Sequence, residues 1–289
     1  MRIDAHIHFW RPANGFDNKP IADNAAYRRD FLPEHVATEL AACGIDGVIA
    51  VQTCPQVEET AWLLDLAECD RQILGVTGWV DLNDAVCDFD ALLARPKLIG
   101  IRAQLRRIAD PGFVERPRVL HNLGRALRAG LGVTILAEAR HYPHVGRALD
   151  ALPAGPITVN HLGLRFPDVD AGAWRGFLRQ CAQRADVFVQ LSGLPFLFGE
   201  RWRDPAPRAV VDDALALLGP RRLVFASDWP MLVRFASYTD WVRYVERLVE
   251  DHRFGTADVD AIFGGNVLRA NPRLRIDAKA TTVPLPCSS

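Results

Sequence analysis

Features that would define many classes of protein are scarce in this 289-residue sequence. It contains six cysteines, and none forms a CxxC pair or a regular framework, so the sequence predicts neither a disulfide scaffold nor a cysteine zinc site. We interpret the cysteines as small buried apolar residues in a reducing compartment. Acidic and basic residues nearly balance at a net charge of −1, which gives no electrostatic argument for binding nucleic acid or an acidic membrane.

The sequence also has little that would place it in a membrane or on a nucleotide. Charged residues interrupt every apolar run before it reaches the length that spans a bilayer. The chain enters its first polar strand at once, so we expect no signal peptide and a cytoplasmic location. No glycine-rich phosphate-binding fingerprint follows any predicted strand, and Gly264-Gly265, alone before Asn266, is interpreted as a turn.

What the sequence does contain is a regular alternation of strands and helices. Hydrophobic residues make up 49% of the chain, and apolar runs of strand length alternate with segments of helical periodicity. The predicted strands are 1–10, 46–52, 73–80, 98–103, 132–138, 156–161, 187–191 and 222–228. The predicted helices are 33–43, 58–69, 89–94, 117–129, 144–152, 173–184, 207–218 and 238–249, with a smaller one near 259–268. This pattern predicts an α/β protein with a single-domain (β/α)8 TIM barrel over 1–276 and a C-terminal extension over 277–289.

The first predicted strand carries a pair of histidines. Apolar residues alternate there with Asp4, His6 and His8, which is the pattern of a strand with one polar face. Both histidines project from the same side, about 6.6 Å apart at the backbone. Neutral imidazole is a good ligand for zinc and similar metals, although an isolated HxH can also be an ordinary pair of surface or core histidines. The rest of the chain has to decide between these interpretations.

Residues that can bind, carry charge or transfer protons stand at the C-terminal end of nearly every predicted strand. The catalytic groups of such barrels lie at these ends. In strand order the residues are His6 and His8, Gln52, Trp79, Arg102 and Gln104, Glu138, His161, Gln190 and Asp228. Three histidines, an arginine and an aspartate in one bowl are typical of a hydrolytic site.

Each of these residues also has a structural interpretation. His161 can cap its strand, and Asp228 can cap a turn in the segment Ala-Ser-Asp-Trp-Pro. Arg102 can be an ion-pair partner of Glu138. Aromatic residues at a barrel mouth can form walls for a sugar-like ring or can simply pack in the core, and the three concerned are Trp10, Trp79 and Trp229.

The segments around these residues resemble the amidohydrolase superfamily, in the amidohydrolase-2 branch that contains sugar-acid and dicarboxylate lactonases. The matching segments are Ile3-Asp-Ala-His-Ile-His-Phe-Trp10, Gly78-Trp-Val-Asp-Leu82, Gly100-Ile-Arg102, Asn160-His-Leu-Gly163, Leu191-Ser-Gly193 and Ser227-Asp-Trp-Pro230. They occur in the family's order from residue 3 to residue 230, so the likeness covers the whole predicted barrel. It implies a (β/α)8 hydrolase with His6, His8, His161 and Asp228 at its centre.

Two positions depart from the family pattern. Many members have a carbamylated lysine on strand four or a histidine on strand five as metal ligands, whereas these strands end here in Arg102 and Glu138. An arginine in the bowl disfavours a dinuclear site, so we expect at most one divalent metal, with zinc favoured. Relatives in the lactonase branch often carry a lysine where this chain has Gln190, so the identity of their substrates does not carry over.

The leading interpretation is a carboxylic-ester hydrolase that opens the lactone ring of a sugar acid or a small dicarboxylate. Asp228 is the predicted general base for attack by water, and Arg102 steadies the oxyanion or binds a substrate carboxylate. The other predicted catalytic residue is His161. One divalent metal is held by some of His6, His8, His161 and Asp228, or the histidines instead donate hydrogen bonds to the carbonyl oxygen.

Two other functions stay open at this point. One is a metal-dependent decarboxylase of an aromatic or unsaturated acid, and the other is a non-catalytic barrel that binds a carbohydrate acid. The expected partner is a small lactone or carboxylate, with no nucleic acid or membrane, and a homo-oligomer is compatible with the sequence. The predicted substrate-binding residues are Trp10, Gln52, Trp79, Gln104, Gln190 and Trp229.

Overall fold

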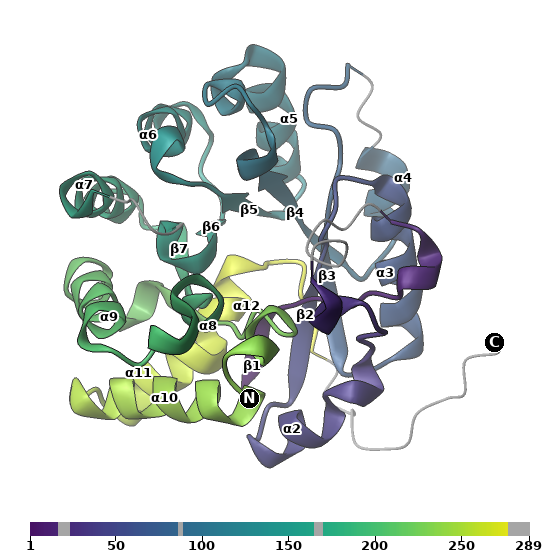
Figure 1. Cartoon of the computed structure of the whole chain (residues 1–289). Helices are drawn as coiled ribbons and strands as arrows, with labels where there is room; N and C mark the ends of the chain where they lie inside the picture. Colours follow the sequence, from purple (N-terminus) through teal and green to yellow (C-terminus); the bar gives the residue numbers. More distant parts are fainter. Residues whose placement is uncertain (17–23, 86–88, 165–169, 277–289) are drawn as a thin grey trace.

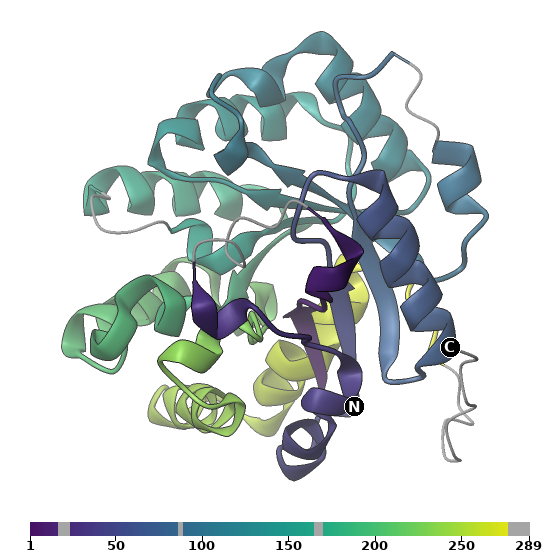
Figure 2. The same cartoon turned by 45° about the vertical axis from the view of Figure 1, so that its right-hand side comes forward.

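The computed structural model describes residues 1–16, 24–85, 89–164 and 170–276. Eight parallel strands pair in chain order in one sheet, with helices around the outside (Figures 1 and 2). The strands are β1 (Ile3–Ile7), β2 (Gly47–Val51), β3 (Ile73–Gly78), β4 (Leu98–Gln104), β5 (Gly132–Leu136), β6 (Ile157–Val159), β7 (Val187–Leu191) and β8 (Leu223–Phe225). The predicted (β/α)8 barrel is confirmed. The predicted C-terminal extension, 277–289, lies outside the described residues.

The sheet closes between β8 and β1 through hydrogen bonds made just beyond β8. The backbone N–H of Asp228 donates to the His6 carbonyl at 2.9 Å, and the N–H of His8 donates to the Trp229 carbonyl at 2.7 Å. Underneath, the buried carboxylate of Asp4 accepts the backbone N–H groups of His6 and Ser227 at 3.1 and 2.9 Å. The first and last strands are therefore fixed to each other directly below the residues predicted to be functional.

The helices follow the predicted positions, and their apolar faces pack on the sheet. They are α2 (Ala37–Ala42), α3 (Val57–Cys69), α4 (Phe89–Leu93), α5 (Pro117–Arg128), α6 (Tyr142–Ala151), α7 (Ala171–Ala182), α8 (Leu194–Phe198), α9 (Pro205–Leu218), α10 (Tyr238–Asp251), α11 (Thr256–Asp260) and α12 (Asn266–Ala270). In α5, Val119, Leu123 and Ala126 recur at helical spacing and are fully buried. A capping box between Ser237 and Asp240 begins α10.

Two hydrophobic layers hold this arrangement. One lies between the sheet and the outer helices, and the other fills the inside of the barrel with residues such as Ile49, Ile99 and Phe188. Val267 and Ala270 of α12 belong to the inner layer, and the Ala270 carbonyl lies against Gly132 at the start of β5. The N-terminal end of the barrel is therefore plugged by α12, which leaves the C-terminal ends of the strands for a site.

Three local predictions are corrected by the structure. Strands β6 and β8 end earlier than expected, because His161 and Asp228 have positive φ angles of 50° and 60°, which a strand cannot accommodate. Helix α8, between β7 and α9, was not predicted, since it has only five residues. Residues 261–265 form a π-helical turn inside the predicted helix near 259–268.

The cysteines are only partly as expected. Cys43, Cys54 and Cys181 are free thiols, and the last two are buried. Cys69 is disulfide-bonded, which corrects the interpretation of the cysteines as free buried residues. Cys87 and Cys287 lie outside the described residues.

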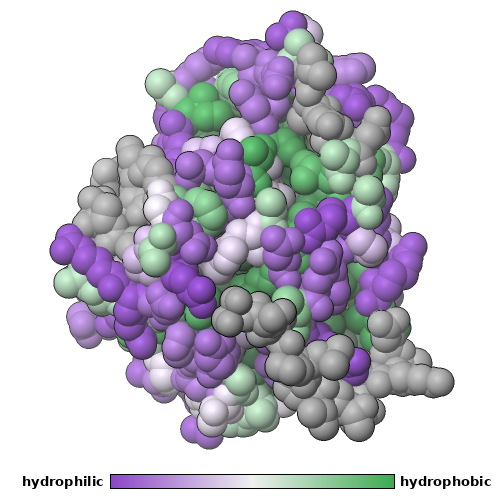
Figure 3. Space-filling view, turned by 90° about the vertical axis from the view of Figure 1, so that its right-hand side faces the viewer, coloured by the Kyte–Doolittle hydropathy of each residue, from purple (hydrophilic) through white to green (hydrophobic). Residues whose placement is uncertain are grey.

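The surface is mixed in polarity. Figure 3 shows hydrophilic side chains over much of one face and hydrophobic ones gathered toward its centre. Among the described residues, no helix has the length and apolar character needed to cross a bilayer.

Candidate active site

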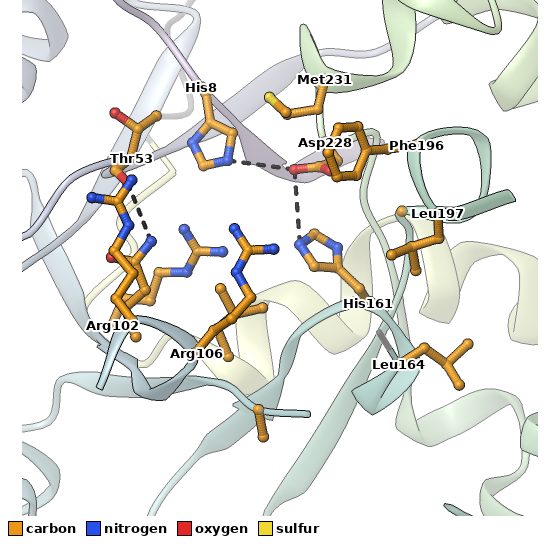
Figure 4. A pocket seen from close by; sticks show the side chains of 15 residues that line it. His8, Thr53, Arg102, Arg106, His161, Leu164, Phe196, Leu197, Asp228 and Met231 are labelled. Carbon is orange, nitrogen blue, oxygen red and sulfur yellow. Dashed lines mark hydrogen bonds and ion pairs between the residues drawn. The ribbon is translucent and has the colours of Figure 1, made fainter. Parts of the chain in front are cut away.

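A cavity opens at the C-terminal ends of the strands. Its lining residues are His8, Thr53, Arg102, Gln104, Arg106, Arg107, Leu136, Ala137, His161, Leu164, Gly193, Phe196, Leu197, Asp228 and Met231. Asp228 lies between His8 and His161, with Arg102 and Arg106 on the facing wall (Figure 4). The structure thus brings together the residues from strands one, four, six and eight that the sequence singled out.

The two histidines of β1 face each other with their Nε2 atoms 3.0 Å apart. His6 Nδ1 lies 2.9 Å from Gln190 Oε1, and His8 Nδ1 lies 2.7 Å from the Val51 carbonyl oxygen. Both partners are acceptors, so each Nδ1 carries the hydrogen and each Nε2 presents a lone pair. Burial, together with the nearby His8 and Arg102, lowers the pKa of His6 well below its usual value. His6 is therefore a neutral imidazole whose free nitrogen points at that of His8.

The Asp228 carboxylate lies against all three histidines. Its Oδ1 is 3.4 Å from His8 Nε2, 3.7 Å from His6 Nε2 and 3.9 Å from His161 Nε2. Burial alone would raise the pKa of Asp228, but His161, His8 and Arg102 outweigh it and hold the pKa below its usual value. The carboxylate is consequently ionised at neutral pH. Its left-handed backbone (φ 60°) turns the chain after β8 so that it faces the cavity.

His161 comes from the turn after β6. Its Nδ1 lies 2.8 Å from Ser192 Oγ, and its backbone is also left-handed at φ 50°. Burial lowers the pKa of His161 to about 4, although the charge of Asp228 opposes this shift. The turn is fixed from behind, because Trp174 Nε1 donates to the Leu162 carbonyl at 2.8 Å. A neutral imidazole is therefore presented to Asp228 from the side opposite His8.

Gly193→Ala should disturb the position of His161. Gly193 has φ +80°, and an added Cβ would lie 3.0 Å from the His161 ring. We expect the free energy of unfolding to fall by about 1–2 kcal/mol from the left-handed backbone, and kcat/KM to fall as well because the ring must move. Gly15→Ala is the matched control, since Gly15 is also left-handed, with φ 71° and ψ 13°, and has nothing within 4 Å of the added Cβ. Equal turnover in the two variants would contradict this role.

Arg102 lines the facing wall and is almost completely buried, at 3% exposed. Its Nη1 donates to the Gln52 carbonyl at 2.9 Å, and its Nε donates to Asn160 Oδ1 at 3.0 Å. Burial lowers the pKa of Arg102 to about 9, against the opposing charge of Asp228, so the guanidinium stays charged at neutral pH. The alternative ion pair with Glu138 is not formed, because the Glu138 carboxylate instead accepts from Arg140 Nε at 2.8 Å.

The predicted substrate-binding residues fall into two groups. Gln104 lines the cavity, and Trp79 is half-buried beside a neighbouring chamber. By contrast, Trp10 and Trp229 are 2% exposed and pack around Phe31. They support the site as core residues, whereas the sequence predicted that they contact the substrate. These two predictions are corrected.

The remaining two predicted substrate-binding residues are amides. Gln190 is buried behind His6, and its Oε1 fixes the tautomer of the His6 ring. In the structure it therefore positions His6, whereas the sequence predicted that it contacts the substrate. Gln52 is fully buried, and neither of its side-chain polar atoms has a hydrogen-bond partner among the described residues. It is not among the described residues that line either the cavity or the chamber.

Other residues of the site were not predicted. Ser192 forms a hydrogen bond with His161, and Asn160 accepts one from Arg102. Both residues lie inside segments that resemble the amidohydrolases, and this resemblance is the sequence feature that could have identified them. Arg106 and Arg107 line the cavity from the short helix after β4. No spacing or periodicity in the sequence distinguishes these two arginines from the many on the surface.

The four clustered side chains fit a divalent cation. The Nε2 atoms of His6 and His8 face each other at 3.0 Å, a separation at which two lone pairs repel each other unless a cation or a proton lies between them. Ligands of a tetrahedral zinc ion with bonds of 2.0–2.1 Å lie about 3.4 Å apart, close to the separations of 3.0–3.9 Å found here. Within the part of the chain that the structure describes, His6, His161 and Asp228 form the one cluster of possible metal-binding side chains whose ligand atoms converge, within 4.8 Å of one another.

Comparison with known proteins agrees with this geometry. The amidohydrolase family model matches residues 3–270. The chain belongs to the amidohydrolase family. It is 32% identical to L-fucono-1,5-lactonase from Burkholderia ambifaria over 92% of this chain and 93% of that protein. A solved amidohydrolase from Burkholderia multivorans with bound zinc is 31% identical, with a TM-score of 0.84 over 93% of this chain and 98% of that one.

Decarboxylases of the same fold are more distant. The 5-carboxyvanillate decarboxylase from Sphingomonas paucimobilis is 13% identical, with a TM-score of 0.61 over 94% of this chain and 98% of that one. A likeness at this identity shows the fold alone. Together, the family and the site identify the protein as a hydrolytic enzyme, and the non-catalytic alternative is set aside.

Proposed function

We propose that the protein hydrolyses a 1,5-lactone of a sugar acid to the open hydroxy acid. The observation that carries the proposal is an ionised carboxylate, Asp228, held 3.4–3.9 Å from three imidazole nitrogens at the wall of the cavity. The family supplies the reaction class, and relatives named L-fucono-1,5-lactonase supply the substrate class.

Asp228 acts as the general base in this proposal. It takes a proton from the attacking water, whose oxygen adds to the lactone carbonyl carbon. When the ring C–O bond breaks, the same proton passes to the ring oxygen as it leaves as an alcohol. Support comes from the lowered pKa of Asp228, which keeps the carboxylate able to accept a proton at neutral pH. Ser192 lies beside His161, with its Oγ 2.8 Å from Nδ1, but it is fully buried and is not among the described residues that line the cavity, so we assign the attack to water.

His6, His8, His161 and Asp228 are the residues that would hold a single zinc ion. When bound, zinc polarises a carbonyl and makes a coordinated water more acidic. Without the ion, His161 is the imidazole that can donate from Nε2 to the carbonyl oxygen, because its Nδ1 can accept the Ser192 hydroxyl hydrogen. In either case the three rings occupy fixed positions, because Gln190, the Val51 carbonyl and Ser192 hold their Nδ1 atoms.

Arg102 supplies positive charge to the oxyanion. Its side chain is fixed by two hydrogen bonds to Gln52 and Asn160, so it needs little reorganisation as negative charge develops on the substrate. Arg106 and Arg107 add guanidinium groups to the same cavity wall. The carboxylate product, which is negatively charged, is therefore formed in a region of positive potential.

Gln190→Leu is expected to weaken metal binding by about 10- to 100-fold, because the acceptor of His6 Nδ1 is lost. Titration with zinc, followed by activity, measures this directly. Gln190→Glu keeps an acceptor oxygen at the same place and serves as the control. If Gln190→Leu and wild type bind zinc equally, the amide does not position His6.

The experiment that tests the function is a panel assay. Purified protein is given L-fucono-1,5-lactone, other aldono-1,5-lactones and a dicarboxylate lactone, and acid release is followed with a pH indicator against the spontaneous rate. Catalysed opening of at least one aldonolactone is expected. A sample that releases carbon dioxide from a hydroxylated benzoic acid and opens no lactone would instead establish the decarboxylase alternative.

A further inference from the structure

A second chamber adjoins the catalytic cavity, between the loops that follow β3 and β4. Arg102, Gln104 and Arg107 line both spaces and form the boundary between them. Most of the other walls are apolar, with Asp81 and Asn83 as polar members. The apolar residues are Pro55, Trp79, Val80, Leu82, Ala103, Ile108 and Phe113. The proposed mechanism uses none of these seven.

Gln104, at the boundary, has an unused hydrogen-bonding atom. Its side chain is 5% exposed, and its Nε2 donates to the Thr53 carbonyl at 3.2 Å. Its Oε1 is buried and has no hydrogen-bond partner among the described residues. A buried acceptor of this kind is normally satisfied, so between the two spaces it can accept an O–H group of a ligand that occupies both.

The two walls differ in chemistry. The catalytic cavity carries His8, His161, Asp228 and arginines, which suit the polar ring and carbonyl of a lactone. The chamber presents Trp79 and Phe113, which suit an apolar group. A substrate that occupied both would place its ring beside Asp228, a ring hydroxyl at Gln104 Oε1, and an apolar exocyclic group in the chamber.

We propose that the chamber binds the exocyclic end of the lactone and prefers there an apolar alkyl or aryl group larger than a methyl. The inference rests on the proposed function, because it assumes that a lactone ring lies beside Asp228. The inference concerns the exocyclic group of the substrate, which distinguishes one lactone from another.

Three lactones that differ only at C6 test this inference. L-Galactono-1,5-lactone carries a hydroxymethyl group, L-fucono-1,5-lactone a methyl group, and 6-O-benzyl-L-galactono-1,5-lactone a benzyl ether; the same series is assayed in the D-configuration. We expect kcat/KM to be about tenfold higher for the benzyl compound than for the hydroxymethyl and methyl compounds, chiefly through KM. The ratio of kcat/KM between two lactones, measured with one enzyme preparation, does not depend on the fraction of the protein that is folded, because that fraction affects both values equally.

Ile108→Trp fills part of the chamber, and it should reduce the benzyl-to-hydroxymethyl ratio by about tenfold. Ile276→Trp is the matched control, because Ile276 is 40% exposed and lies outside both spaces. The inference is overturned if lactones are hydrolysed with ratios near one, or if Ile108→Trp leaves the ratios unchanged. If no lactone is hydrolysed, the proposed function itself fails, so the two failures are distinguishable.

Discussion

Asp228→Asn is expected to lower kcat by about 10²- to 10⁴-fold, which is the usual contribution of a general base. Asparagine keeps the shape of the side chain and tolerates the left-handed backbone at φ 60°, so the fold should be retained. The amide cannot accept the proton of the attacking water. Steady-state hydrolysis of the best lactone from the panel measures the effect, with circular dichroism as the check on folding.

Glu138→Gln is the discriminating control for this prediction. Glu138 stands at the end of the fifth predicted strand and is the next carboxylate that the sequence offers as a base. In the structure its carboxylate pairs with Arg140. We therefore expect Glu138→Gln to leave kcat within a few-fold of wild type. A near-wild-type rate in Asp228→Asn together with a large loss in Glu138→Gln would transfer the role of base to Glu138.

The sequence was sufficient for the barrel because its signals repeat. Eight apolar runs at regular spacing define eight parallel strands. When the strands form a closed barrel, the polar residues at their C-terminal ends meet at one face. His6, His8, His161 and Asp228 could be named on this basis. The precise ends of β6 and β8 could not, because His161 and Asp228 are in left-handed turns that have no glycine to mark them.

The roles of individual polar and aromatic residues were harder to predict than their positions. Trp10 and Trp229 are close in sequence to His8 and Asp228, yet both are buried against Phe31. Neighbouring residues of a turn point in different directions, so one can face the cavity while the next faces the core. Gln190 was expected to contact substrate, but it points at the back of His6. Which side of a strand end faces the cavity depends on the closure of the whole barrel, and periodicity alone does not specify it.

One zinc ion per chain is the expected metal content, and thorough chelation should abolish most of the activity. His6, His161 and Asp228 provide a set of converging ligands, with His8 Nε2 3.4 Å from the same carboxylate, and the charged guanidinium of Arg102 on the facing wall opposes a second cation nearby. Elemental analysis of protein purified without added metal measures the content. Activity that returns on addition of one equivalent of zinc shows that the loss is due to the metal.

His6→Ala supplies the second half of this test. It removes one Nε2 ligand and leaves the cavity wall intact, because His6 is buried behind the residues that line the cavity. Metal content should fall to a small fraction of an ion per chain, with a loss of turnover that added zinc only partly restores. His35→Ala is the control, since His35 lies on the short helical turn before α2, away from the cluster. Two ions per chain in the wild type would contradict a single site, and full activity after chelation would show that Arg102 and the histidines act without a bound metal.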